Sequence, residues 1–86
     1  MTTAALYFVN DGSASALCWF SSRREAQKAS VDLHRVCGWT CPVEVKPLDL
    51  LPQDEVERLA TLDGADASVR RVAAREIAAR VRRASL

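Results

Sequence analysis

Two short apolar runs near the start of the chain place the strongest constraint on its fold. ALYFV (residues 5–9) and ALCWF (residues 16–20) are rich in aromatic and aliphatic side chains, and the segment NDGSAS lies between them. Asp11 and Gly12 in this segment suit the positive φ angles of a tight turn. The pattern predicts a β-hairpin with a loop of about four to six residues.

Both faces of the predicted hairpin are apolar, and this sets a requirement for the rest of the chain. Period-two alternation gives the members of each expected face: Leu6, Phe8, Cys18 and Phe20 on one, and Tyr7, Val9, Leu17 and Trp19 on the other. A single helix covers one face, so later helices or a partner must cover the second. Large exposed apolar patches usually mark interfaces. We expect the protein's own helices to cover both faces, and the surplus aromatic surface makes Tyr7 and Trp19 candidate partner-binding residues.

The middle of the chain predicts a helix followed by an edge strand. Ser22 and Glu25 have the spacing of a capping box, and Gly38 is a natural left-handed stop, so we expect a helix over residues 23–36. Its apolar stripe has four members: Ala26, Ala29, Leu33 and Val36. The alternation in VEV (residues 43–45), bracketed by two prolines, is typical of a short edge strand.

Two further helices are expected in the second half. An acidic helix over about residues 52–63 starts near Pro52 and ends at Gly64. A basic helix over about residues 67–84 follows, with Asp66 or Ser68 as its N-cap. The order ββαβαα predicts a small α+β domain over residues 1–86, with a short antiparallel hairpin and an edge strand covered by helices.

Charge is distributed unevenly along the chain. The net charge is +1, yet residues 49–66 carry six acidic groups against Arg58, and residues 67–86 carry six arginines against Glu76. We expect these two segments to attract each other. No apolar run approaches the length of a membrane span, and the first residues lack the pattern of a signal peptide, so we expect a cytoplasmic protein without membrane contact.

The basic helix is amphipathic. Its apolar arc has five members: Val69, Val72, Ala73, Ile77 and Val81. Arg71, Arg75 and Arg82 lie opposite this arc, while Arg70, Arg80 and Arg83 lie at its borders with their charged heads in water. We expect the arc to be buried against the hairpin or a second subunit. The three opposite arginines would then be a surface for a partner, either an acidic protein or the phosphates of a nucleic acid. The sequence pI of about 7.7 is lower than that of a dedicated nucleic-acid binder.

Three cysteines and one histidine supply metal-ligand atoms without metal-site spacing. Cys18, His34, Cys37 and Cys41 have the composition of a Cys₃His zinc site, but neither a CxxC nor an HxxxH pair is present. We therefore expect reduced, mostly buried thiols and no metal or cofactor. Trp39 follows Gly38 in a loop, where it is either a lid on the core or an anchor for a partner.

The function expected from these features is macromolecular binding. No nucleophile–base pair, carboxylate pair or phosphate loop is recognisable, which favours a non-enzymatic interaction protein, in the style of phage or plasmid inhibitors of a host complex. A protein partner is the leading hypothesis. A nucleic-acid-binding regulator using the last helix and a homodimeric structural subunit are the alternatives. The candidate partner-binding residues are Tyr7, Trp19, Trp39, Arg71, Arg75 and Arg82.

Overall fold

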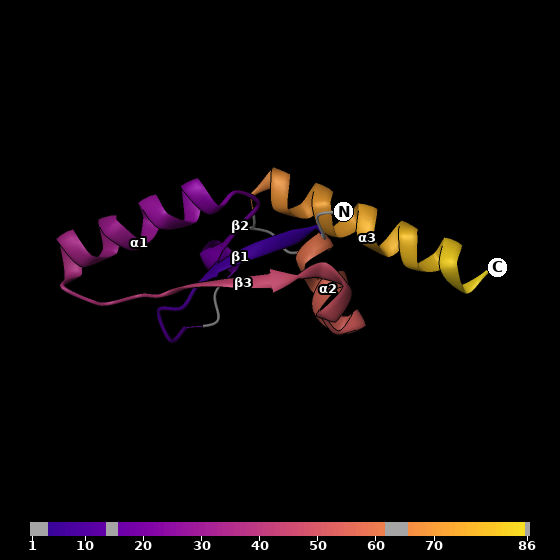
Figure 1. Cartoon of the computed structure of the whole chain (residues 1–86), viewed down its shortest axis with the longest axis horizontal. Helices are drawn as coiled ribbons and strands as arrows, with labels where there is room; N and C mark the ends of the chain where they lie inside the picture. Colours follow the sequence, from indigo (N-terminus) through magenta and orange to yellow (C-terminus); the bar gives the residue numbers. More distant parts are fainter. Residues whose placement is uncertain (1–3, 14–15, 62–65, 86) are drawn as a thin grey trace.

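Three antiparallel strands lie at the centre of the computed structural model, which describes residues 4–13, 16–61 and 66–85 (Figure 1). They are β1 (Ala5–Val9), β2 (Trp19–Phe20) and β3 (Val43–Pro47). The strand order is β2-β1-β3, so β1 is central and β3 is an edge strand, as predicted. Five residues of β1 pair with β3, from Ala5 opposite Pro47 to Val9 opposite Val43.

Three helices complete the domain. They are α1 (Arg23–Cys37), α2 (Gln53–Thr61) and α3 (Ala67–Ala84). The order ββαβαα confirms the predicted α+β class. Figure 1 shows α1 and α3 following one another along the upper side of an elongated molecule that measures 49 × 30 × 19 Å, with α2 below α3. None of the described helices is long and apolar enough to cross a membrane.

The hairpin differs from the prediction in its connection and its register. Residues 16–18 form a turn of 3₁₀-helix, so the connection covers residues 10–18 and is longer than expected. Tyr7 lies opposite Phe20, and Phe8 lies opposite Trp19. The predicted grouping of Phe8 with Phe20 and of Tyr7 with Trp19 was therefore wrong. A register shift of one residue moves all the side chains of a strand to the other face of the sheet. The 3₁₀ turn comes directly before β2, so the extended strand begins only at Trp19.

Helix α1 begins after Ser22 and ends at Gly38, as predicted. Gly38 has a φ of 73°, and its N–H donates to the His34 carbonyl over 2.9 Å. Ser22 has the extended backbone of an N-cap, but among the described residues its side chain makes no capping hydrogen bond. Val36, the last residue of the expected stripe, is 81% exposed. Figure 1 shows the reason, because α1 extends past the end of the sheet.

Two hydrophobic clusters lie on the two faces of the sheet. The larger cluster joins β1 and β2 to α2 and α3 through Leu6, Trp19, Leu48, Val56, Leu59, Val69 and Ala73. The smaller one contains Val9, Ala26 and Cys41, with Tyr7 and Phe20 packed against it beneath α1. Helices of the same chain therefore cover both faces of the hairpin, as the sequence requires.

The start of α3 is fixed by its N-cap. The Asp66 carboxylate accepts hydrogen bonds from the backbone N–H and the hydroxyl of Ser68, over 3.0 and 3.1 Å. The Ser21 hydroxyl, directly after β2, donates to the Ser68 hydroxyl over 2.8 Å. These contacts confirm Asp66 as the cap and join the first turn of α3 to the sheet. The predicted end of the acidic helix at Gly64 lies outside the described residues.

Replacing Leu59 with Ala should lower the free energy of unfolding by roughly 2–5 kcal/mol, because Leu59 is buried in the larger cluster and its loss leaves a cavity. Leu50→Ala is the matched control, since Leu50 is exposed and its truncation should change stability by less than about 0.5 kcal/mol. Urea denaturation midpoints measure both effects. Equal midpoints for the two variants would contradict the assignment of Leu59 to the core.

Replacing Asp66 with Ala should lower the melting temperature at neutral pH, and the difference from wild type should shrink in acid. Hydrogen bonds from the Ser68 backbone and side chain hold the pKa of Asp66 below its usual value. Its contribution is therefore complete above the unfolded-state pKa and is lost as pH falls through the lower folded-state pKa, below about pH 4.

Asp66→Asn is the control for this experiment, because Asn retains a capping oxygen without a titrating carboxylate. Thermal melts followed by circular dichroism from neutral pH down to about pH 2.5 separate the variants. A constant difference between wild type and Asp66→Ala over this range would show that the carboxylate charge does not support the cap.

Candidate partner-binding site

Helix α3 buries its apolar arc over most of its length. Val69 and Ala73 are fully buried, and Val72 and Ile77 are partly buried against the same cluster. Val81 is 60% exposed, so the prediction that the hairpin buries it was wrong, while burial against a second subunit stays a prediction. Figure 1 shows that the last turns of α3 extend beyond the sheet and α2, where no described element covers them.

Arg80 is directed into the structure, whereas the sequence predicted its charged head in water. Its Nη2 donates to the carbonyl oxygens of Leu48 and Leu51, both over 2.7 Å. Its Nη1 donates to the Gln53 side-chain oxygen over 3.1 Å. Arg80 therefore joins α3 to the 3₁₀ turn Leu48–Leu50 and to the start of α2.

Glu76 binds two of the arginines of its own helix. Its Oε1 lies 3.4 Å from Arg80 Nε and 2.9 Å from Arg83 Nη2, and its side chain is 10% exposed. Glu76 thus offsets part of the positive charge of Arg80 and Arg83, whereas Arg75 and Arg82 form no salt bridge among the described residues.

The predicted attraction between the acidic segment, residues 49–66, and the basic segment, residues 67–86, is present at Asp66, where the charges of Arg70 and Arg71 help to lower the pKa of the carboxyl group. No salt bridge joins α2 to α3 among the described residues.

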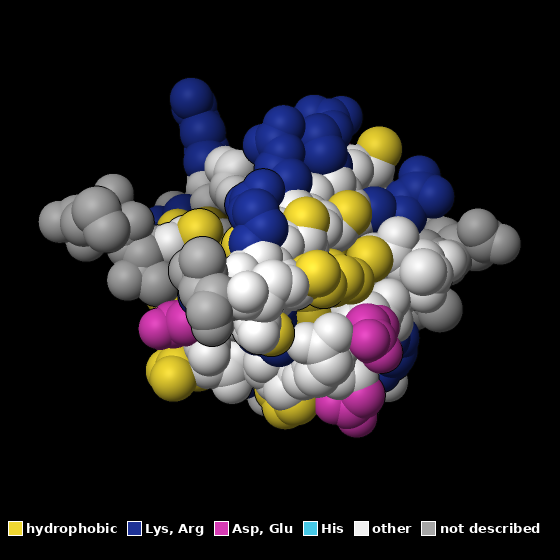
Figure 2. Space-filling model, turned by 90° about the vertical axis from the view of Figure 1, so that its right-hand side faces the viewer, with side chains coloured by type: hydrophobic (Ala, Val, Ile, Leu, Met, Phe, Trp, Pro, Cys, Tyr) yellow, Lys and Arg dark blue, Asp and Glu magenta, His cyan; other side chains and the backbone are white. Residues whose placement is uncertain are grey.

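Arg71, Arg75 and Arg82 lie on the exposed side of α3, where the sequence placed them. Among the salt bridges of the described residues, none involves these three side chains, although the Asp66 carboxylate at the start of the helix is close enough to Arg71 for the positive charge to help lower the pKa of Asp66. Figure 2 shows most of the basic side chains of this face in its upper part, with hydrophobic side chains beneath them and acidic side chains lower down. The upper part of this face is therefore the more basic one.

A groove beside α3 combines two of these arginines with apolar side chains. It has a volume of about 350 Å³ and is lined by Ala4, Leu48, Val72, Arg75, Glu76, Ala79 and Arg82. We call it the α3 groove. The helical wheel identified Arg75 and Arg82, but it could not identify Ala4 and Leu48, which come from other parts of the chain.

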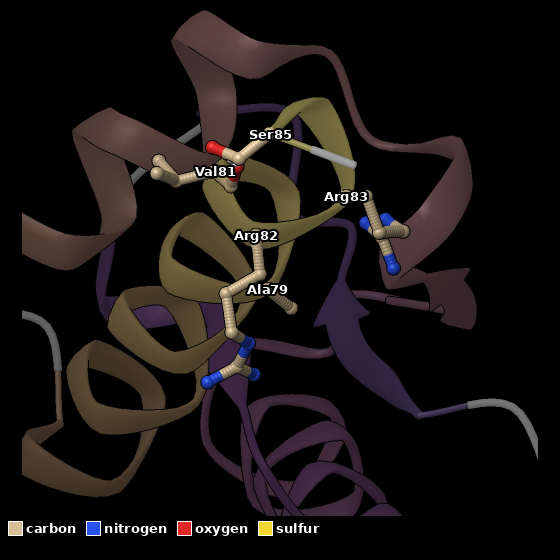
Figure 3. A pocket seen from close by; sticks show the side chains of 5 residues that line it. All are labelled: Ala79, Val81, Arg82, Arg83 and Ser85. Atoms are coloured by element: carbon tan, nitrogen blue, oxygen red, sulfur yellow. Dashed lines mark hydrogen bonds between the residues drawn. The ribbon is translucent and has the colours of Figure 1, made fainter.

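A shallower hollow of about 570 Å³ adjoins the end of α3. Its lining residues are Ala79, Val81, Arg82, Arg83 and Ser85. Figure 3 shows Arg82 and Arg83 pointing to different sides of the helix end, with Val81 pointing away from both. Arg82 and Ala79 line this hollow as well as the α3 groove, so the two form a continuous surface at the end of the helix.

The three candidate aromatic residues lie in different environments. Trp19 is 6% exposed, and its ring centroid lies 5.1 Å from that of Phe8. Tyr7 packs against the smaller cluster, with the Arg23 guanidinium 5.6 Å from its ring centroid. Trp39 is 56% exposed and lines a hollow of about 380 Å³ between Asn10 and Cys41. Trp19 and Tyr7 therefore stabilise the fold, while Trp39 lies on the surface, far in sequence from the arginines of α3.

The four candidate zinc ligands are not gathered. Cys18 and Cys41 are buried, and Cys37 and His34 are exposed. Within the described ranges, no three His, Cys, Asp or Glu side chains lie close enough to share a metal ion. Burial raises the pKa of the Cys18 thiol, and a hydrogen bond with Asp11 raises it further, so this thiol is a poor nucleophile at neutral pH.

A search for similar proteins does not add to this geometry. No protein-family model, no curated protein and no solved structure matches the chain. The chemistry of the α3 groove and the charges around it are therefore the features that bear on function.

Replacing Arg80 with Ala should destabilise the protein by roughly 2–3 kcal/mol, because it removes charge-assisted hydrogen bonds to two backbone carbonyls at a partly buried position. Arg80→Lys should recover part of the loss, since an ammonium group lacks the planar fork of arginine. Arg82→Ala is the control on the same helix and should be close to neutral. Chemical denaturation measures all three, and an Arg80→Ala variant as stable as Arg82→Ala would refute the structural role.

Proposed function

We propose that the protein is a non-enzymatic interaction protein whose α3 groove binds an acidic, partly hydrophobic segment of another protein. The observation that carries this proposal is the composition of the groove. Arg75 and Arg82 line it together with apolar side chains from three different parts of the chain. The groove thus offers both charge and apolar surface to a bound segment.

The electrostatics of the groove favour an acidic ligand. Glu76 also lines it, but this carboxylate is already paired with Arg80 and Arg83. The two arginines that line it on the exposed side of α3 have no such partner among the described residues. They are seven residues apart, which places them on one side of the helix and about 10 Å apart along its axis. Two carboxylates at a similar separation on a partner segment would each meet one guanidinium.

The apolar lining favours a protein ligand. Leu48, Val72 and Ala79 line the groove and can bury an aliphatic side chain from the partner. Nucleic-acid contacts are dominated by phosphates, which gain little from such surface. Arginine and a desolvated apolar centre are the features of protein–protein hot spots.

A nucleic-acid partner is the second candidate, and the row of exposed arginines favours it. Arg71, Arg75 and Arg82 extend over about 16 Å of the helix on its exposed side. Such a row could follow a phosphate backbone. The low net charge and the acidic side chains elsewhere on the same face reduce the electrostatic attraction to a nucleic acid.

The double variant Arg75→Glu/Arg82→Glu should weaken binding to the physiological partner by at least about tenfold, because it places acidic groups against an acidic ligand. Partners captured from source cells by the tagged wild-type protein are identified by mass spectrometry, purified and titrated against each variant by calorimetry. Arg24→Glu on α1 is the matched control, since it reverses an exposed charge away from the groove.

Two results would contradict this function. A purified partner that binds the double variant as tightly as wild type would place the binding surface elsewhere. Tight binding of a short DNA or RNA duplex, with a steep dependence on salt and loss in the double variant, would favour the nucleic-acid alternative. Measurements of folding by circular dichroism on each variant separate loss of contact from loss of structure.

A further inference from the structure

We propose that two copies of this chain pair through the free edge of β3, antiparallel and centred on Val45. In the described part of the chain, β3 has β1 as its neighbour on one side and no strand on the other. Exposed strand edges pair readily with further strands. The direction of the outward backbone groups and the charges of the side chains both favour the β3 strand of a second copy as the strand that pairs with this edge.

Two hydrogen bonds that flank the ladder between β1 and β3 show which backbone groups of β3 remain available. The Asn10 N–H donates to the Pro42 carbonyl, and the Leu48 N–H donates to the Ala4 carbonyl, each over 3.0 Å. Pairs that exchange hydrogen bonds alternate along an antiparallel ladder. Glu44 and Lys46 therefore direct their backbone groups toward β1, while Val43, Val45 and Pro47 direct theirs outward.

Val45 provides apolar surface at the centre of this edge. It is 45% exposed, although its neighbour Val43 packs against the cluster beneath α1. In a pair centred on Val45, the two Val45 side chains lie side by side on one face of the extended sheet. Val45 also exchanges both of its backbone hydrogen bonds with the partner's Val45.

Pro47 is compatible with this pairing. It lies opposite the partner's Val43, whose N–H can donate to the Pro47 carbonyl. Proline lacks an N–H, so the reciprocal bond is absent, but its ring is tolerated at the end of an edge strand. The outward N–H groups of Val43 and Val45 thus both find acceptors.

The charges on the opposite face select the register. With Val45 at the centre, Glu44 lies opposite the partner's Lys46, and Lys46 lies opposite the partner's Glu44. The neighbouring registers would place Glu44 against the partner's Glu44, or Lys46 against the partner's Lys46. Cross-strand pairs of opposite charge stabilise a sheet and like charges destabilise it. Within one chain, Lys46 Nζ lies 3.1 Å from Glu44 Oε1, so both groups are already held on the same face.

Charge reversal tests this pairing. Sedimentation velocity over a concentration series up to about 1 mM should show a reversible dimer for wild type. Glu44→Lys and Lys46→Glu should each weaken the homodimer by about tenfold or more, because each change places like charges opposite one another. An equimolar mixture of the two variants should form a heterodimer, and the double variant Glu44→Lys/Lys46→Glu should dimerise like wild type.

A backbone variant tests the edge independently of charge. Val45→Pro removes an N–H that points outward, so it should abolish the dimer while leaving the ladder to β1 intact. Its melting temperature and circular dichroism verify that it folds. Val31→Ala removes an exposed apolar side chain from α1 and serves as the control that should still dimerise.

Two outcomes would overturn the proposal. One is a wild-type protein that remains monomeric over the whole concentration series. The other is a dimer whose affinity is unchanged by the single charge reversals, which would place the interface elsewhere. The experiment does not involve Arg75 or Arg82, so its result is independent of the function proposed for the α3 groove.

Discussion

The guanidinium of Arg80 fixes the position of α3 relative to the rest of the molecule. One nitrogen of this side chain binds the carbonyl oxygens of Leu48 and Leu51, at the junction between β3 and α2. Leu48 begins the 3₁₀ turn Leu48–Leu50 and Leu51 directly follows it, so Arg80 binds the chain at the point where the ladder of the sheet has ended. Because Leu48 lines the α3 groove together with Val72 and Ala79, the same contact that anchors the helix also brings the walls of the groove together.

Glu76 reduces the repulsion between the arginines of α3. Its carboxylate lies between Arg80 and Arg83 and is nearly enclosed, so a local network of one acid and two bases stabilises the middle of α3. Arg71, Arg75 and Arg82 do not share in it. Although the net charge of the chain is only +1, α3 contains two classes of arginine. Arg80 and Arg83 bind Glu76, whereas Arg71, Arg75 and Arg82 are exposed.

Local signals in the sequence predicted the element order and several boundaries. Gly38 ends α1 and Asp66 caps α3, because left-handed backbone and free N–H groups impose requirements that few residues meet. The exposure of Arg71, Arg75 and Arg82 follows from helical periodicity alone.

Features that depend on distant parts of the chain could not be predicted in this way. Residues 16–18 form a 3₁₀ turn before β2, so only Trp19 and Phe20 pair with β1. The apolar pattern of residues 16–20 does not distinguish such a turn from the start of a strand. A helical wheel gives the side of the helix on which Arg80 lies. It cannot show that the carbonyl oxygens of Leu48 and Leu51 lie within hydrogen-bond distance of its guanidinium. Val36 and Val81 are exposed because their helices are longer than the surface beneath them, and helix length carries no information about the size of the sheet.

The shortness of β2 limits how far the sheet can grow. This strand has two residues, and the chain leaves it at Ser21, whose hydroxyl is bonded to Ser68 of α3. The β2 edge thus offers very little ladder to an incoming strand, whereas the β3 edge offers five residues. If β3 is the one long free edge, as it is among the described residues, pairing of two copies about a two-fold axis would use it on both copies. The dimer that we propose would therefore be closed, and the same geometry would oppose growth into a filament.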